Sequence, residues 1–142
     1  MSDQLLSKSE QAGIYYLAAT RRNMIENAAR QLRFRHWHLE IVPGQMADAV
    51  LEQIGKVLHF PEWYGANFDA LHDCLTDPEC LPGTGHILTI SGCSSLRSSD
   101  PEGFATLLEV FKAATDDLRQ AGVPLWILLD KPLPGIHSLP AA

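Results

Sequence analysis

Three aspartates spaced four residues apart, Asp69, Asp73 and Asp77, are the side chains whose types and spacing most clearly indicate chemistry. They lie in the segment 57–96, which holds five carboxylates and no lysine or arginine. If residues 67–77 form a helix, this spacing stacks three negative charges along one face. Like charges at this spacing cost a helix roughly 0.2–0.5 kcal/mol per pair. Folding alone gives no reason for the stripe, which leaves two interpretations: a merely solvated acidic face, or a preformed surface for a basic partner.

The opposite face of the same predicted helix is apolar. It carries Phe68, Leu71, Cys74 and Leu75. Asn67 precedes the first helical residue and is predicted to cap the helix, because its side-chain oxygen can accept a hydrogen bond from a free backbone N–H. The sequence therefore predicts a helix with one side in the core and one acidic side.

Other kinds of site fit these residues less well. Asp69 and Asp73 lie one turn apart on one face, so they cannot flank a glycosidic bond from opposite sides as an acid and a base. Asp69, His72 and Asp73 have metal-ligand spacing, but a dedicated site needs further ligands and supporting hydrogen bonds. We expect no catalytic residue and no metal.

The remaining candidates have structural interpretations. His36 and His38 share one face of a predicted strand, where two histidines are more often exposed or hydrogen-bonded than functional. Cys74 points to the apolar side of its helix. As a nucleophile it would need a nearby cation or base that converts its thiol to a thiolate, so we interpret it as a core residue. The segment 91–96, SGCSSL, matches neither a dinucleotide-binding loop nor a P-loop. We expect no cofactor.

Composition limits the class of protein. The chain has 142 residues, enough for one domain with its own core, and its net charge of −6 argues against nucleic-acid binding. Its three cysteines, Cys74, Cys80 and Cys93, form no zinc-binding or disulfide pattern. There is no signal-peptide pattern and no long apolar span. We therefore expect a cytoplasmic protein that does not contact membranes and is a monomer when free.

Hydrophobic periodicity predicts alternating strands and helices. The predicted strands are 13–19, 37–42, 86–92 and 124–130, and the predicted helices are 21–34, 44–58, 67–77 and 101–122. This alternation implies right-handed crossovers, and so an α/β fold with a small, mainly parallel sheet covered by helices. We expect a single domain over 13–130, a polar tail over 1–12 and a proline-rich tail over 131–142.

The first predicted helix has two distinct faces. Met24, Ile25, Ala28 and Leu32 form its apolar face. Arg22, Arg30 and Arg33 form a basic stripe with Glu26 among them, which is typical of a solvated face with ion pairs.

Residues 60–77, FPEWYGANFDALHDCLTD, resemble the signature of the barstar family, cytoplasmic inhibitors of extracellular barnase-type ribonucleases. The wider resemblance runs from about 36 to 130. It implies a barstar-like fold, and residues 1–35 would add an N-terminal strand and helix to it.

The resemblance also implies a mechanism. A ribonuclease site holds cations that bind phosphate, and carboxylates on a helix can occupy the phosphate positions. The family's two central helix carboxylates correspond to Asp69 and Asp73, with Asp73 at the centre of the partner's phosphate site. Trp63 corresponds to an aromatic residue that packs on the partner, and Asn67, Phe68 and Thr76 correspond to the rim.

The sequence departs from the family pattern around this centre. His72 replaces a bulky aromatic residue, Ala66 replaces an acidic one, and Asp77 with Pro78 replaces glycine and tryptophan. His72 and Asp77 are still expected at the partner surface. A later helix supplies a further carboxylate in the family, where this chain has Ala113. Either Asp117, one helical turn after Ala113, or Glu109, one turn before it, could supply this carboxylate instead.

The resulting hypothesis is a non-enzymatic inhibitor of a basic ribonuclease. The alternative is an interaction module of the same fold whose basic partner is another toxin or a regulatory protein. A small hydrolase using the acidic face is a third possibility, which would require a concave pocket. We expect Pro61, Tyr64, Gly65 and Leu71 to shape the scaffold.

Overall fold

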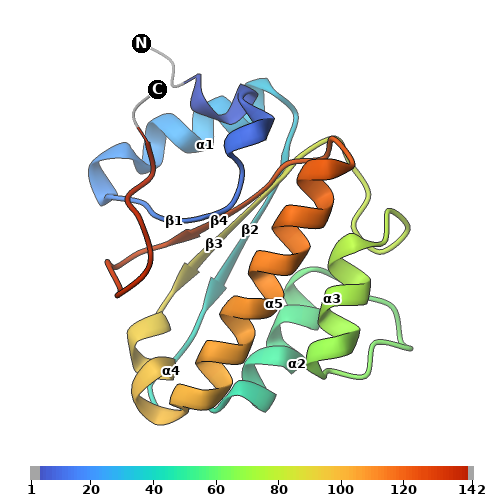
Figure 1. Ribbon diagram of the computed structural model, residues 1–142, viewed down its shortest axis with the longest axis vertical. Coiled ribbons are helices and arrows are strands. Elements are labelled where there is room, and N and C mark those ends of the chain that lie inside the picture. The colour runs from blue at the N-terminus through green and yellow to red at the C-terminus, as the bar shows by residue number, and fades with distance from the viewer. Residues whose placement is uncertain (1–3, 141–142) are drawn as a thin grey trace.

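The computed structural model describes residues 4–140, which form a four-stranded sheet with helices on both faces (Figure 1). All neighbouring strands are parallel, in the order β1-β4-β3-β2. The strands are β1 (Ile14–Tyr16), β2 (Arg35–Glu40), β3 (His86–Ser91) and β4 (Leu125–Leu129). The α-helices are α1 (Arg22–Gln31), α2 (Ala47–Val57), α3 (Phe68–Thr76), α4 (Cys93–Ser99) and α5 (Pro101–Gln120). The predicted α/β class, with an added N-terminal strand and helix, is confirmed.

The core lies on both faces of the sheet, because side chains alternate along each strand. In β4, Ile127 and Leu129 face α2, α3 and α5, while Trp126 and Leu128 face α1. All five residues of β4 are buried. This explains the uninterrupted apolar run of the last strand, which is typical of a parallel strand covered on both sides.

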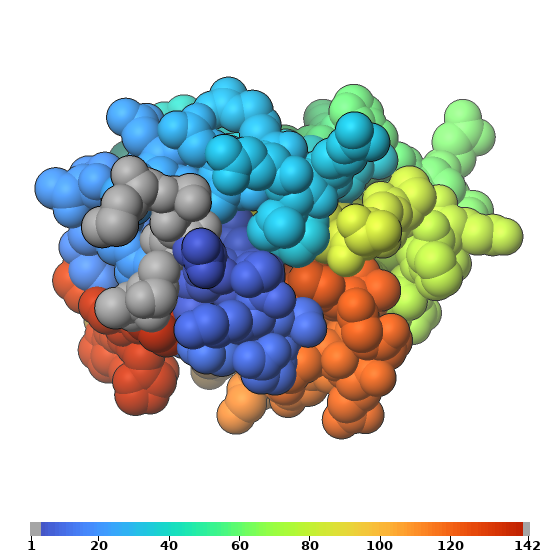
Figure 2. Space-filling model, turned by 90° about the horizontal axis from the view of Figure 1, so that it is seen from above, coloured from blue at the N-terminus to red at the C-terminus, as the bar shows by residue number. Residues whose placement is uncertain are grey.

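The predicted tails are partly wrong, because both contribute to the core. Leu5 and Leu6 are fully buried, within short 3₁₀ turns over residues 5–11. Figure 2 shows this segment, dark blue, between α1 and the end of α5. At the other terminus Leu139 is buried, and its N–H donates to the carbonyl of Tyr16 at 2.8 Å. Residues 1–3 and 141–142 of these predicted tails lie outside the described residues.

The apolar face by which helix α1 packs on the sheet is narrower than its hydrophobic periodicity predicts. Ile25 and Ala28 are buried, but Met24 and Leu32 are 39% and 37% exposed. Leu32 lies past the last helical residue, as its C-cap. The predicted solvated basic face is confirmed by the pair of Arg22 with Glu26, at 3.0 Å.

The sequence did not predict helix α4. Its serines favour caps and turns, so the segment has little helical signal. The helix begins after Gly92, which has φ of 87° and whose absent Cβ would collide with the carbonyl oxygen of Ile41. A side chain is therefore excluded at this turn.

His86, at the start of β3, is completely buried, and its ring lies 5.6 Å from that of Trp37. Neither ring nitrogen has a hydrogen-bond partner in residues 4–140. Burial, and secondarily the charge of Arg35, lowers the pKa of His86 to about 4. The folded protein therefore holds this imidazole in its neutral form.

We predict that His86 makes the fold sensitive to acid. The pKa of His86 in the folded protein is below the unfolded value of 6.5. The contribution of His86 to the free energy of unfolding is therefore intact above pH 6.5 and is lost as the pH falls toward 4. The free energy of unfolding should fall by about 2 kcal/mol more between pH 7 and pH 5 in wild type than in His86→Leu. Urea unfolding at the two pH values measures this, with the exposed His137→Gln as a control. Equal losses in wild type and His86→Leu would contradict the prediction.

Candidate partner-binding surface

Helix α3 presents its acidic side to solvent because its apolar side is anchored. Leu71, Cys74 and Leu75 are fully buried, and Leu71 and Leu75 belong to the same core cluster as Phe111 of α5. The side chain of Asp73 on the opposite face is 74% exposed. The predicted two-sided helix is confirmed.

The predicted N-cap is also confirmed. The Asn67 Oδ1 atom accepts a hydrogen bond of 2.8 Å from the N–H of Ala70. Asp69 lies in the first turn, where the helix dipole favours a negative charge. The start of α3 is therefore determined by side chains that are themselves candidates for the partner surface.

The loop before α3 is held by Tyr64. Its hydroxyl donates to the carbonyl of Leu51 at 2.8 Å, and its ring contacts Phe60 edge-on with centroids 5.0 Å apart. Burial is the main cause that raises the pKa of Tyr64 to about 12. A Cβ on Gly55 would lie 2.6 Å from the Tyr64 ring, so glycine is needed where α2 meets this loop. Trp63, on the same loop, is 62% exposed.

Five of the predicted contact residues line one shallow, open hollow. They are Trp63, Asn67, Phe68, Asp69 and Asp73. The tryptophan ring and the two carboxylates therefore lie close enough for one partner surface to contact them together. Their role in binding remains a prediction.

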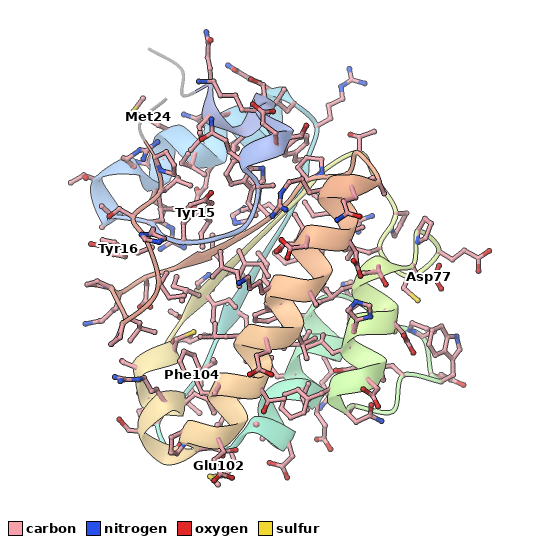
Figure 3. The ribbon with its side chains drawn as sticks, viewed as in Figure 1. Tyr15, Tyr16, Met24, Asp77, Glu102 and Phe104 are labelled. Atoms are coloured by element: carbon pink, nitrogen blue, oxygen red, sulfur yellow. The ribbon has the colours of Figure 1, made fainter. Side chains whose placement is uncertain are left out.

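The third aspartate does not continue the stripe, so that part of the prediction is wrong. Asp77 follows the last helical residue with φ −93° and ψ 117°, because a residue before proline is disfavoured in the α region. Its Oδ1 atom accepts from the N–H of Glu79 at 2.9 Å, and Figure 3 shows it beyond the end of α3. Thr76 donates its hydroxyl to the carbonyl of His72 at 2.8 Å. Asp77 and Thr76 therefore stay near the surface, but their side chains are hydrogen-bonded to residues close to them in the sequence.

His72 links α3 to α5. Its Nε2 atom lies 2.9 Å from Oδ2 of Asp117, and its Nδ1 atom lies 3.9 Å from Oδ1 of Asp73. Of the two carboxylates considered on the later helix, Asp117 is therefore the one beside α3. Glu109 lines a different hollow, together with Ile14 of β1. No local pattern predicts this link, because 45 positions separate His72 from Asp117.

The other candidate residues have structural roles. Thr89 binds both His36 and His38, through its Oγ1 atom at 3.4 and 2.8 Å. Burial raises the pKa of Cys74 and of Cys93 to about 12, so these thiols stay protonated at neutral pH. The prediction that Cys74 is a core residue is confirmed.

The described part of the chain offers no cluster of three or more metal-ligating side chains. Within residues 4–140, no helix is long and apolar enough to cross a membrane.

We predict that Asn67→Ala lowers the free energy of unfolding by about 1 kcal/mol, because α3 loses its N-cap. Asn67→Asp should retain most of the stability, since a carboxylate also caps a helix and interacts favourably with its dipole. Urea unfolding measures both variants. The interpretation of Asn67 as a cap fails if the alanine variant is as stable as the aspartate variant.

Comparison with known proteins agrees with this geometry. A search of curated proteins gives no match. A family model described as Barstar (barnase inhibitor) matches residues 32–130, which include β2, β3, β4 and the whole acidic helix α3. The match covers well over half of the chain, and the chain therefore belongs to the barstar family.

Proposed function

We propose that this protein inhibits a basic ribonuclease of the barnase type by inserting the carboxylates of Asp69 and Asp73 into its active site. One observation carries the proposal: two solvent-exposed aspartates stand one turn apart on a helix whose other face is buried. The family match supports the same role, because its description is that of a barnase inhibitor.

The charge around these aspartates supports a cationic partner. Across residues 4–140, neither Asp69 nor Asp73 pairs with a lysine or arginine. Their mutual repulsion is therefore unrelieved in the free protein, and cations of a partner would relieve it. A ribonuclease supplies such cations, since it binds the phosphates of RNA. The two carboxylates would take the place of those phosphates.

The surroundings of the pair fit a binding surface better than a catalytic one. The hollow that contains the aspartates is open, and Trp63 beside it offers a large apolar side chain of the kind that dominates protein interfaces. We infer a role as a binding protein and not as an enzyme. The three free cysteines support a location in the cytoplasm, where thiols stay reduced.

A second candidate function has a specific observation in its favour. His72 and Asp77 stand where the resemblance to the family implies other residues, and in this chain His72 is bound to Asp117 while Asp77 is turned into a local loop. A basic partner other than a ribonuclease would fit the same central carboxylates. Inhibition of RNA cleavage distinguishes the two functions, because only the first predicts it.

We predict that Asp73→Ala weakens binding to a barnase-type ribonuclease by at least about 30-fold. Removing one member of a desolvated charge pair costs about 2–5 kcal/mol and leaves the partner's cation unpaired. Titration of RNA cleavage with wild type and variant measures the loss. Glu10→Ala is the matched control, because it removes an exposed carboxylate that is distant from Asp73 in the sequence. Equal effects of the two substitutions would place the interface elsewhere.

We also predict that the association rate falls steeply with salt. The net charge of −6 and the exposed aspartates would steer a cationic partner, and dissolved ions screen this attraction. Stopped-flow mixing from about 0.05 to 0.5 M NaCl measures the dependence. An association rate that does not change over this range would contradict electrostatic steering.

A further inference from the structure

The contacts of His72 determine which of its nitrogens carries the proton when the ring is neutral. The Nε2 atom lies 2.9 Å from Oδ2 of Asp117, and a carboxylate can only accept a hydrogen bond. The hydrogen of a neutral imidazole therefore belongs on Nε2, and Nδ1 keeps its lone pair. The ring is partly exposed, with 35% of the side chain accessible.

The lone pair on Nδ1 is next to the central carboxylate of the surface. The Oδ1 atom of Asp73 lies 3.9 Å away, and both atoms are acceptors. We propose that His72 Nδ1 and Asp73 Oδ1 form a two-acceptor site for one guanidinium group of the partner, with Asp117 holding the ring in the required tautomer. The inference rests on the proposed function and names the group that this part of the surface recognises.

A guanidinium group fits this pair better than an ammonium group does. It carries its N–H donors in a rigid planar fork, so two of them can point at neighbouring acceptors together. An ammonium group is a compact charge without this fixed geometry. His72 is in this way a specificity-determining residue, since it distinguishes an arginine from a lysine at the same place.

The first experiment observes the ring directly and needs no ribonuclease. Histidine side-chain ¹⁵N NMR of the full chain at about pH 7.5 should show a proton on Nε2 and none on Nδ1 of His72. Methylguanidinium chloride should then shift the Nδ1 signal of His72, while methylammonium chloride at equal concentration should shift it less. A proton on Nδ1, or equal shifts with the two cations, overturns the proposal.

The second experiment measures affinity for a barnase-type ribonuclease at a single pH. His72→Leu has no acceptor atom beside Asp73, so it should bind roughly tenfold more weakly than wild type. The matched control His137→Gln, at an exposed histidine elsewhere, should behave as wild type.

The outcomes separate this inference from the proposed function. If His72→Leu binds the ribonuclease as tightly as wild type, the two-acceptor site is overturned and the inhibitor function stands. If wild type does not bind the ribonuclease, the inhibitor function fails, and the methylguanidinium titration decides the two-acceptor site by itself.

Discussion

The packing of the apolar face of α3 against the core is the interaction on which the candidate site depends. A helix of nine residues is too short to be stable alone in water, and this one also carries like charges one turn apart. Burial of Leu71, Cys74 and Leu75 offsets both costs. The exposed aspartates are therefore held in position by the core beneath them, and not by the intrinsic stability of their helix.

The N-terminal unit contributes to the same arrangement from the other side of the sheet. The family match begins at residue 32, yet Trp126 and Leu128 of the central strand β4 pack on residues that precede it, including Leu5 and Ile25. A parallel sheet with one apolar face exposed to water would lose much of its hydrophobic stabilisation. The added strand and helix, with Leu139 from the C-terminus, complete the second layer of the core.

Electrostatic features of the surface act against stability and in favour of binding. Asp69 and Asp73 repel one another and pair with no lysine or arginine within residues 4–140. A protein selected only for stability would place a lysine or arginine nearby. The free protein is instead already arranged for a cation that arrives with a partner, so little reorganisation is needed on binding.

The sequence by itself determined the fold class, the order of the main helices and strands, and the two-sided helix with its Asn67 cap. These features follow from local periodicity and from hydrogen bonds between residues close in the chain, as in the bond from Ala70 to Asn67. The tertiary structure alone decided that Leu5 and Leu139 are buried, since short segments without periodicity acquire a position only by packing. It also brought Asp117 to His72 across 45 residues, a pairing that depends on how α3 and α5 cross and that no local pattern encodes.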